Sequence, residues 1–450
     1  MPSADERIAA GAQMRMITVL LLCALGFGLT FYVFYPGVMT FDARYVYNDI
    51  GKSPLVDWQS PLMVLLWGAI DPIAPGSGSM LLLDVSLYWL AFTLLALTVA
   101  RRSWFAVALP LLALSPPAFV LVGIIWRDVL FAAVWLLAAV LVFAANDSKA
   151  RARYWVQGFA LVLLAFGVLI RPNALTAAPI LAAFILWPSR FALKRTLILY
   201  LPALAVCYAL VPIVYYGMIG AKKVYPLHSI VVFDLGGITH FSKQNQFPVS
   251  WTPEQTTLLT EQCYQPKEWN YYWNVGPCQF VMRRLEDDKI FGTPALADAW
   301  QRAVMHHPVA YLEHRSAFMT TFLTKSNLAM WTFDLNDPTK VAFPDNAALM
   351  RLKAIHDVLQ PTFLFWQGTW LLLCLGLCAL AWRWRDSPEG AFVLGVCGSG
   401  VAYVATYFFL GVASDYRYSY WAVLAGMAGV VVVMPRLMGR GVPSTVSDIA

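Results

Sequence analysis

Charged residues are scarce in this chain, and their scarcity argues against a soluble protein. Asp, Glu, Lys and Arg make up 13% of the 450 residues, whereas a soluble domain carries about 25%. Hydrophobic residues reach 59% and the mean hydropathy is +0.61. The composition therefore predicts an integral membrane protein. The net charge of +6 does not indicate nucleic-acid binding, because the basic residues lie in short clusters between apolar runs.

Several local motifs are also missing from the sequence. It contains no glycine-rich phosphate loop of the Walker type, no Cys-x-x-Cys pair, no internal repeat and no low-complexity tract. His306 and His307 are adjacent, so they would point apart on a helix rather than share a metal ion. These patterns do not require a divalent metal, and whether one binds is left open.

Long apolar runs dominate what is present. They are continuous over about 20 residues, which favours transmembrane helices over the alternating strands of about 10 residues in a β-barrel. The predicted fold class is an all-α polytopic membrane protein with about ten transmembrane helices. The spans lie near residues 17–35, 80–100, 104–125, 129–145, 155–170, 174–188, 196–216, 361–381, 391–412 and 418–434.

Basic clusters between the runs predict the orientation. Five of them fall on the side of the N-terminus, as the positive-inside rule expects of cytoplasmic loops: Arg101-Arg102, Lys149 to Arg153, Arg190 with Lys194-Arg195, Arg383 to Arg385, and Arg436 with Arg440. Both termini are therefore expected in the cytoplasm. No small-residue cleavage site precedes Tyr35-Pro36-Gly37, so the first run is interpreted as an uncleaved span.

This topology divides the chain into three parts. Residues 1–216 form an N-terminal membrane module with a first outward loop at 36–79, residues 217–360 an outward, periplasmic segment, and residues 361–450 a C-terminal membrane part of three helices. Pro61 to Ile70 is apolar but too short to span, which predicts an interfacial helix. The stretch from His307 to Leu323 predicts an amphipathic helix on or near the membrane.

The seven cysteines divide into two groups. Cys263 and Cys278 lie together in the outward segment, which predicts a disulfide in an oxidising compartment. A metal site is the alternative for this pair, although no Cys-x-x-Cys motif or spaced histidine pair accompanies it. The others lie in predicted spans and are expected to be small apolar residues: Cys23, Cys207, Cys374, Cys378 and Cys397.

Acidic residues gather in the first outward loop. If residues 40–50 form a helix, Asp42, Tyr45 and Asp49 lie on one face at i, i+3 and i+7, and Asp57 follows. Carboxylates are costly near lipid and persist there mainly where they face a cavity, a partner or a substrate. Asp42, Asp49 and Asp57 are therefore the candidate catalytic residues. The alternatives are structural, with Asp42 complementing a helix dipole and Asp57 capping a helix.

Arginines recur at the short outward turns, against the positive-inside bias. Converging guanidinium groups predict a phosphate or another anion, because they bind such oxygens in pairs. The candidate substrate-binding residues are Arg44, Tyr45, Arg127, Arg171, Asn173, Lys222, Lys223, His228, Asp415 and Arg417. The structural alternatives are ion pairs that close the Arg127-Asp128 and Asp415–Arg417 turns, and an Arg171 that snorkels to lipid headgroups.

The layout as a whole resembles the GT-C superfamily of membrane glycosyltransferases, which includes protein O-mannosyltransferases and lipid A aminoarabinose transferases. The resemblance rests on four motifs, Phe41-Asp42-Ala43-Arg44-Tyr45, Trp58-Gln59-Ser60-Pro61-Leu62, Arg171-Pro172-Asn173-Ala174-Leu175 and Asp415-Tyr416-Arg417-Tyr418. The chain also departs from the family's pattern. Many members have a second acidic residue beside the first, where this chain has Phe41 and Ala43, and Pro-Pro where it has Ser60-Pro61.

The resemblance implies a sugar on a polyprenyl phosphate as donor and a hydroxyl of a lipid, glycan or protein as acceptor. Transfer would take place with inversion on the periplasmic side of a bacterial inner membrane. Asp42 would be the general base, and the arginines would bind the departing phosphate. The low-dielectric boundary is expected to raise the pKa of Asp42.

Other functions remain open at this stage. An O-antigen polymerase or ligase also acts outward on lipid-linked glycans, but it would carry a late outward loop rich in Arg and His. A transporter or flippase of lipid-linked glycans would place ionisable residues near midspan, often in two related halves. A non-catalytic scaffold would explain the aromatic outward segment but not the acidic first loop.

Overall fold

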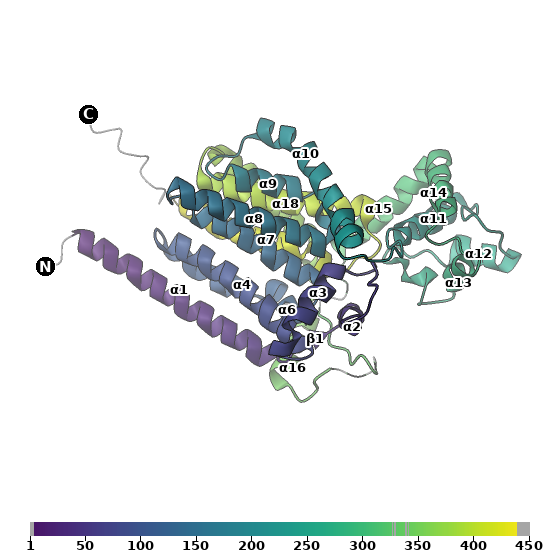
Figure 1. The fold of residues 1–450 in the computed structure, drawn as a ribbon, viewed down its shortest axis with the longest axis horizontal. Helices are drawn as coiled ribbons and strands as arrows, with labels where there is room; N and C mark the ends of the chain where they lie inside the picture. The colour runs from purple at the N-terminus through teal and green to yellow at the C-terminus, as the bar shows by residue number, and fades with distance from the viewer. Residues whose placement is uncertain (1–3, 326, 328–329, 338–339, 341, 439–450) are drawn as a thin grey trace.

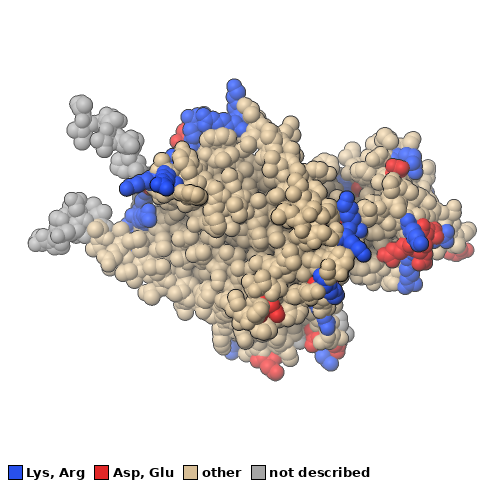
Figure 2. Space-filling model, viewed as in Figure 1, with Lys and Arg blue, Asp and Glu red and all other residues tan. Residues whose placement is uncertain are grey.

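The computed structural model describes residues 4–325, 327, 330–337, 340 and 342–438, and it is almost wholly helical. Figure 1 shows an elongated molecule, with a bundle of long helices at one end and a cluster of shorter helices at the other. The first described helix, α1, begins at the bundle's far end, away from that cluster. The surface over the middle of the bundle carries almost no charged side chains in the view of Figure 2, as a surface in contact with lipid requires.

Seven described helices are long and apolar enough to cross a membrane, which makes this a multi-pass membrane protein. Each arises from a continuous apolar run, and the predicted spans locate all of them. They are α1 (Ala4–Phe34), α4 (Ser77–Ala100), α7 (Arg127–Ala144), α8 (Ala150–Ile170), α10 (Leu193–Pro212, continued by a π-helical turn, Ile213–Met218), α18 (Pro388–Leu410) and α19 (Tyr420–Leu437).

The other three predicted spans differ from simple transmembrane helices. Residues 104–125 form a broken segment: a 3-10 turn (Trp104–Val107) and α5 (Ala108–Ala113) meet α6 (Pro116–Val122) at 53°. The break falls at Pro116, whose ring suits a helix start but not its interior. The helices α9 (Ala178–Leu186) and α17 (Gln367–Ala381) have 9 and 15 residues, fewer than the 17 or so that cross a bilayer.

A two-stranded parallel sheet fixes residues 36–79, the predicted first outward loop. β1 (Val38–Met39) pairs with β2 (Ile124–Ile125), with Val38 opposite Ile124. A side chain at Gly123 would overlap the Phe34 ring, so only glycine lets the two segments approach. The loop continues into α2 (Phe41–Asn48), α3 (Pro61–Ile70) and a 3-10 turn (Asp71–Ile73). Because parallel strands end at the same edge, residues just after β1 lie beside residues just after β2.

The predicted interfacial helix at 61–70 is confirmed as a helix with the same bounds, α3. Ser60 caps it, since its hydroxyl accepts a hydrogen bond from the Met63 N–H, and Pro61 occupies the first turn. Thr40 caps α2 in the same way by accepting from the Ala43 N–H. Asp42 therefore lies in the first turn of a capped helix, directly after β1.

Residues 217–360, predicted to face outward and called the outward segment, contain short helices. The cluster is formed by α11 (His228–Ser242), α12 (Pro253–Glu261), α13 (Phe280–Asp287), α14 (Pro294–His306) and α15 (Pro308–Thr324), whereas α16 (Ala347–Leu359) packs against α1 and α6 (Figure 1). Short 3-10 turns complete the chain at Pro172–Ala174, Trp269–Tyr272, Phe363–Phe365, Trp382–Trp384 and Tyr416–Ser419. The predicted disulfide is confirmed: Cys263 and Cys278 are joined, and the other five cysteines are free.

A buried charge cluster ties this segment to the membrane bundle. The Asp234 carboxylate on α11 pairs with Arg315 at 2.6 Å and with His314 at 3.0 Å, and all three side chains are fully buried. Arg315 then donates to the Gly411 carbonyl at 2.8 Å, at the end of α18. Gly411 lies four residues before Asp415, so the outward segment holds the turn that carries Asp415 and Arg417.

Candidate functional site

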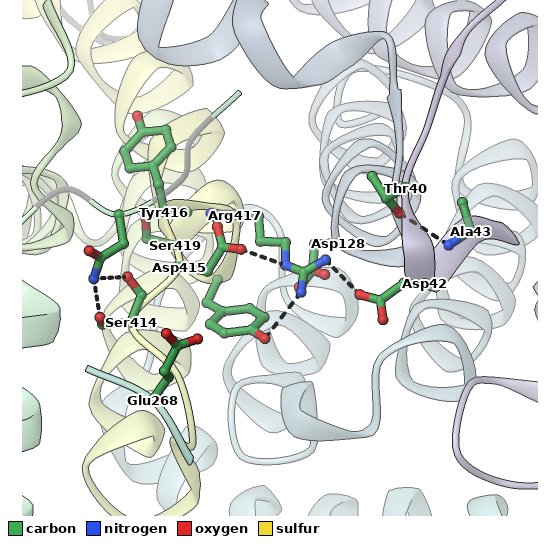
Figure 3. A network of polar contacts seen from close by, with 12 residues as sticks. Thr40, Asp42, Ala43, Asp128, Glu268, Ser414, Asp415, Tyr416, Arg417 and Ser419 are labelled. Carbon is green, nitrogen blue, oxygen red and sulfur yellow. Dashed lines mark hydrogen bonds and ion pairs between the residues drawn. The ribbon is translucent and has the colours of Figure 1, made fainter. Parts of the chain in front are cut away.

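The ion pair between Asp42 and Arg417 lies at the centre of the site. The Arg417 Nη1 atom lies 2.8 Å from the Asp42 Oδ2 atom, and the Gln59 side-chain amide donates to the Asp42 Oδ1 atom at 3.1 Å. Figure 3 shows Arg417 reaching from its turn toward Asp42 on the first outward loop. Two of the sequence motifs, one near each end of the chain, therefore meet at the Asp42 carboxylate.

Arg417 is held by further contacts. Its Nε atom lies 3.1 Å from the Asp415 carboxylate, and its Nη2 atom donates to the Tyr418 hydroxyl at 3.3 Å. Its guanidinium group stacks over the Trp126 ring at 4.4 Å, a cation–π distance. The predicted structural pairing of Asp415 with Arg417 is thus present, but the same guanidinium group also bridges to Asp42.

Arg171 lies behind this pair, in a buried position. Its Nε atom lies 2.9 Å from the Asp128 carboxylate, and both side chains are at most 4% exposed. It also donates to the Tyr407 hydroxyl at 3.1 Å and lies 4.9 Å from the centre of the Tyr418 ring. Arg171 does not snorkel to lipid headgroups, so that alternative is wrong. Asp128 pairs with Arg171 rather than with its neighbour Arg127, so the alternative of an Arg127-Asp128 pair is also wrong.

Arg127 differs from Arg171 and Arg417, because it contacts no carboxylate among the described residues. It is half-buried, and within the described part of the chain its guanidinium group makes no hydrogen bond or ion pair. It lines a small cavity of about 10 Å³, just enough for one water molecule. The residues around this cavity are Asp42, Ala43, Val46, Gln59, Met63, Ile125, Trp126 and Arg127. Asp42 and Arg127 thus share a cavity because β1 and β2 end side by side.

The electrostatics of Asp42 differ from the prediction. Burial raises the pKa of this carboxyl, but the positive charges of Arg417, Arg127 and Arg171 together outweigh it, so the pKa lies below its ordinary value. The expected rise in the pKa of Asp42 is therefore wrong, because the sequence does not show how close these cations lie.

The pKa of Asp415 shifts in the opposite direction. Burial raises its pKa to about 7, and Arg417 offsets only part of that rise.

Asp49 and Asp57 lie apart from this ion-pair cluster. Asp49 ends α2 and pairs with the exposed Lys52 at 3.0 Å. Asp57 accepts hydrogen bonds from the Tyr216 hydroxyl at 2.7 Å and from the Val224 N–H at 2.6 Å. Asp57 therefore fastens the first outward loop to the segment after α10, where Val56 and Lys222 form a parallel bridge. The structural alternative fits Asp57 better than the catalytic one, although its partners are not those of a helix cap.

The remaining predicted residues of α2 do not line the cavity beside Asp42. Arg44 donates to the Leu335 carbonyl at 3.3 Å and to the Asn336 side chain at 3.0 Å, both in the loop before α16. Tyr45 is 43% exposed, and burial together with the nearby Asp49 charge raises its pKa. The structure thus does not bring Arg44 or Tyr45 to the cavity that Asp42 lines.

The predicted residues elsewhere have other surroundings. Lys222 and Lys223 are exposed, and Lys223 lies over the Tyr216 ring at 4.7 Å. The His228 ring accepts a hydrogen bond from the Gly292 N–H at 3.2 Å, and burial lowers its pKa. Asn173 is half-buried in the 3-10 turn after α8. None of these four residues lines the Asp42 cavity.

Several residues of the site were not predicted. Gln59 belongs to the Trp58-Gln59-Ser60-Pro61-Leu62 motif and Trp126 directly precedes Arg127, and these positions are the signal that could have identified them. Tyr403 and Tyr407 are hydroxyl-bearing residues at i and i+4 on an apolar helix, a spacing that places both on one face toward Arg171.

Three tryptophans form a cluster beside Gln59 and the Asp415 turn. The Trp58 ring lies 6.3 Å from Trp269 and 6.1 Å from Trp273, and the last two stack at 5.5 Å. Trp269 is tied to the Asp415 turn, because its N–H donates to the Val412 carbonyl at 2.8 Å. Trp273 is 42% exposed, so the cluster presents an aromatic face next to the site.

Within the described residues, no three His, Cys, Asp or Glu side chains form a group that could hold a metal ion. The cations nearest to Asp42 are Arg417, Arg127 and Arg171, which can bind an anion. Comparisons with known protein families, with curated proteins and with solved structures find no match to this chain. The geometry and chemistry of the site therefore carry the functional argument.

Proposed function

We propose that this protein is a membrane glycosyltransferase, with Asp42 as general base and arginines binding the leaving phosphate. The donor is a sugar on a polyprenyl phosphate, and the acceptor is a hydroxyl of a lipid, glycan or protein. One observation carries the proposal: a carboxylate, Asp42, shares a cavity with Arg127 and an ion pair with Arg417 at the outward end of an apolar helical bundle.

In the proposed step one proton is transferred, one bond to the anomeric carbon forms and another breaks. The acceptor oxygen attacks the anomeric carbon and loses its proton to Asp42. The bond between that carbon and the phosphate oxygen breaks, and the polyprenyl phosphate leaves with the electron pair. Attack opposite the leaving group inverts the anomeric carbon. A positioned general base contributes about 10² to 10⁴ in rate, and cations at the phosphate stabilise the charge that develops there.

The lowered pKa of Asp42 is compatible with a role as general base if binding of the donor changes the partners of Asp42. Arg417 holds the carboxylate ionised, which leaves it ready to accept a proton but makes it a weak base. A donor phosphate competes for the same guanidinium N–H groups, because phosphate and carboxylate oxygens are both good partners for arginine. Binding of the phosphate to Arg417 would therefore weaken the hold on Asp42 and increase its basicity when the sugar is in place.

The arginines take different parts in this proposal. Arg127, which has no carboxylate contact among the described residues, is the first candidate for the phosphate, and Arg417 is the second. Arg171 forms an ion pair with Asp128, so we assign it a positioning role. Its guanidinium group lies over the Tyr418 ring, while Arg417 donates a hydrogen bond to the Tyr418 hydroxyl.

The proposed topology keeps about ten crossings, with both termini in the cytoplasm of a bacterium. The short α9 lies between the outward end of α8 and the basic start of α10, so the chain must return across the membrane there. The short α17 likewise connects the outward segment to the start of α18. Both short helices pack against their long neighbours, which would let the flanking turns complete each crossing.

A transporter is the second candidate, and a specific residue favours it. Asp84 lies within the span α4 and is fully buried, and neither of its carboxyl oxygens has a hydrogen-bond partner in the described structure. Ionisable residues inside membrane spans often mark ion or proton pathways. The Asp84→Asn variant distinguishes the two functions: a transporter would lose substrate flux, whereas the glycosyltransferase would keep its transfer rate within about twofold, since Asp84 lies outside the Asp42 cluster.

Mass spectrometry of cell-envelope lipids and glycans tests the proposal. Cells lacking this protein should accumulate an acceptor that lacks one sugar, together with the unused sugar–polyprenyl phosphate. The mass difference identifies the sugar, and the truncated molecule identifies the acceptor. An intact set of envelope glycans, with no change in polyprenyl-phosphate sugars, would contradict the proposal.

A further inference from the structure

A second cavity lies within the bundle, at a position unrelated to the Asp42 site. It measures about 680 Å³ and opens between α9, α10, α17 and α18. Its wall is almost wholly apolar and includes the side chains of Ile180, Leu193, Leu197, Leu375, Trp382 and Leu394. Its size is comparable to the pockets of 300–1,000 Å³ that bind drug-sized ligands, so it can hold a sizeable part of an acyl chain.

The α10 side of this cavity faces outward from the bundle. No residue in the most apolar window of α10 is buried, and Leu197 and Leu201 are 64% and 71% exposed. Figure 1 shows α10 at the edge of the bundle, with α9 and α18 beside it. In a membrane, lipid chains therefore surround α10 and can enter the cavity beside it without crossing a polar barrier.

Basic residues adjoin the wall residues at one end of the cavity. The wall residues Phe191 and Leu193 are adjacent in sequence to Arg190 and Lys194, and the wall residue Trp382 is adjacent to Arg383. The Phe191 N–H donates to the Arg385 carbonyl at 2.6 Å, which joins the two basic segments at this end. Figure 2 shows Lys and Arg side chains gathered at the end of the bundle near the start of α10.

Positive charge exceeds negative charge at this end. Arg190 and Arg385 share a single carboxylate, Asp386, at 3.9 and 3.8 Å. Lys194 and Arg383 have no carboxylate partner among the described residues, and Arg195 lies over the Trp187 ring at 5.7 Å. The cavity thus combines an apolar wall with an uncompensated group of cations at its end.

We propose that this cavity binds an anionic glycerophospholipid, with an acyl chain between α10 and the α9–α17–α18 wall and the phosphate at the basic end. Basic pockets between transmembrane helices favour anionic headgroups, because each Lys or Arg near the headgroup adds attraction. A zwitterionic lipid would fill the cavity equally well but would not match the excess of positive charge. The site is independent of the proposed sugar transfer, since it shares no residue with the Asp42 cavity.

Native mass spectrometry of the full chain in detergent tests the proposal with two lipids that share the same acyl chains. We expect dioleoyl-phosphatidylglycerol to bind more tightly than dioleoyl-phosphatidylcholine. The double variant Lys194→Gln/Arg195→Gln should weaken phosphatidylglycerol binding about thirtyfold, as two lost basic contacts predict, and leave phosphatidylcholine binding unchanged. The matched control Arg151→Gln/Arg153→Gln removes the same charge at the start of α8, away from the cavity, and should retain the wild-type preference.

A variant of the cavity itself separates the groove from the surface charge. Leu197→Trp adds bulk at the cavity wall without changing the charge, and it should reduce the binding of both lipids. Equal affinity of the wild type for both lipids would overturn the proposal. So would an equal loss of phosphatidylglycerol binding in the control variant, because that outcome would assign the preference to overall charge.

Discussion

Arg417 donates to the Asp42 carboxylate across 2.8 Å, although 375 positions separate the two residues in the chain. The contact joins the first outward loop to the turn before the last helix. It depends on two separate supports, the β1–β2 pairing that positions Asp42 and the Arg315–Gly411 hydrogen bond that holds the turn before Arg417. The site is therefore a property of the assembled bundle rather than of any single segment.

Replacing Arg417 by Lys should impair transfer about tenfold or more while leaving expression unchanged. A lysine ammonium is a point charge, and it cannot keep the separate contacts to Asp42, Asp415 and Tyr418 that the planar guanidinium makes. Initial rates with purified protein in lipid nanodiscs provide the measurement. Arg284→Lys, in an exposed pair with Asp288 on α13, is the matched control and should keep the wild-type rate.

Asp57 and Asp49 should differ in their effect on stability. Asp57→Ala leaves the Val224 N–H and the Tyr216 hydroxyl without their acceptor, which costs about 1–3 kcal/mol for a buried group. Asp49→Ala removes only a pair with an exposed Lys52, which is worth about 0–1 kcal/mol. Thermal unfolding of the two variants in the same detergent measures the difference. Equal unfolding temperatures would argue against the fastening role of Asp57.

The pH dependence of donor binding should report on Asp415. Its pKa of about 7 in the folded protein means that the carboxyl loses its proton as the pH rises through 7. The new negative charge then competes for Arg417, so KM for the donor should rise above pH 7. Asp415→Asn should remove this rise, whereas the control Asp288→Asn should retain it. A donor KM in the Asp415→Asn variant that still rises through pH 7 would contradict the assignment.

The same ionisation has a consequence for stability, and its sign follows from the direction of the shift. Because burial raises the pKa of Asp415 from 3.8, the folded protein retains this proton at pH values where the unfolded chain has lost it. The contribution to the free energy of unfolding therefore falls as the pH rises from about 4 to about 7 and then stays constant.

The disulfide should stabilise the outward segment. Cys263 and Cys278 are 15 positions apart, and closing a loop of about this length is worth about 3 kcal/mol in the chain-entropy model. Cys263→Ser should therefore make the outward segment more susceptible to limited proteolysis, whereas Cys207→Ser in α10 should not. Non-reducing peptide mapping of protein from an oxidising compartment should recover the linked pair, and finding both thiols free would contradict the expectation.

Local patterns in the sequence predicted the elements that depend on local physics. The bounds of α3 follow from Ser60 and Pro61, and the Cys263–Cys278 pair follows from its isolation in the outward segment. The bend near Pro116 was missed, although Pro116-Pro117 follows a serine inside the predicted span. A continuous apolar run conceals such a break, because hydropathy does not register the missing backbone N–H groups.

Contacts between distant segments were predictable only in part. Counting spans predicts that Asp42, Arg127 and Arg417 lie on the same side of the membrane, and the structure brings the three residues together. The partner of Asp128 was not predictable, since adjacent residues at a helix start point in different directions and the nearest arginine in sequence is not the nearest in space. The pKa of Asp42 could not be predicted for the same reason, because it depends on three arginines contributed by separate turns.

Complementation by Asp42→Asn tests the central claim most directly. The two side chains are nearly isosteric, so the variant should insert and accumulate like the wild type, but it has no carboxylate to accept a proton. In cells that lack the protein, the wild type and the control Asp288→Asn should restore the missing sugar on the envelope acceptor. Asp42→Asn should leave the acceptor unextended, as a loss of about 10² to 10⁴ in rate predicts. A full restoration by Asp42→Asn at wild-type protein levels would contradict the account.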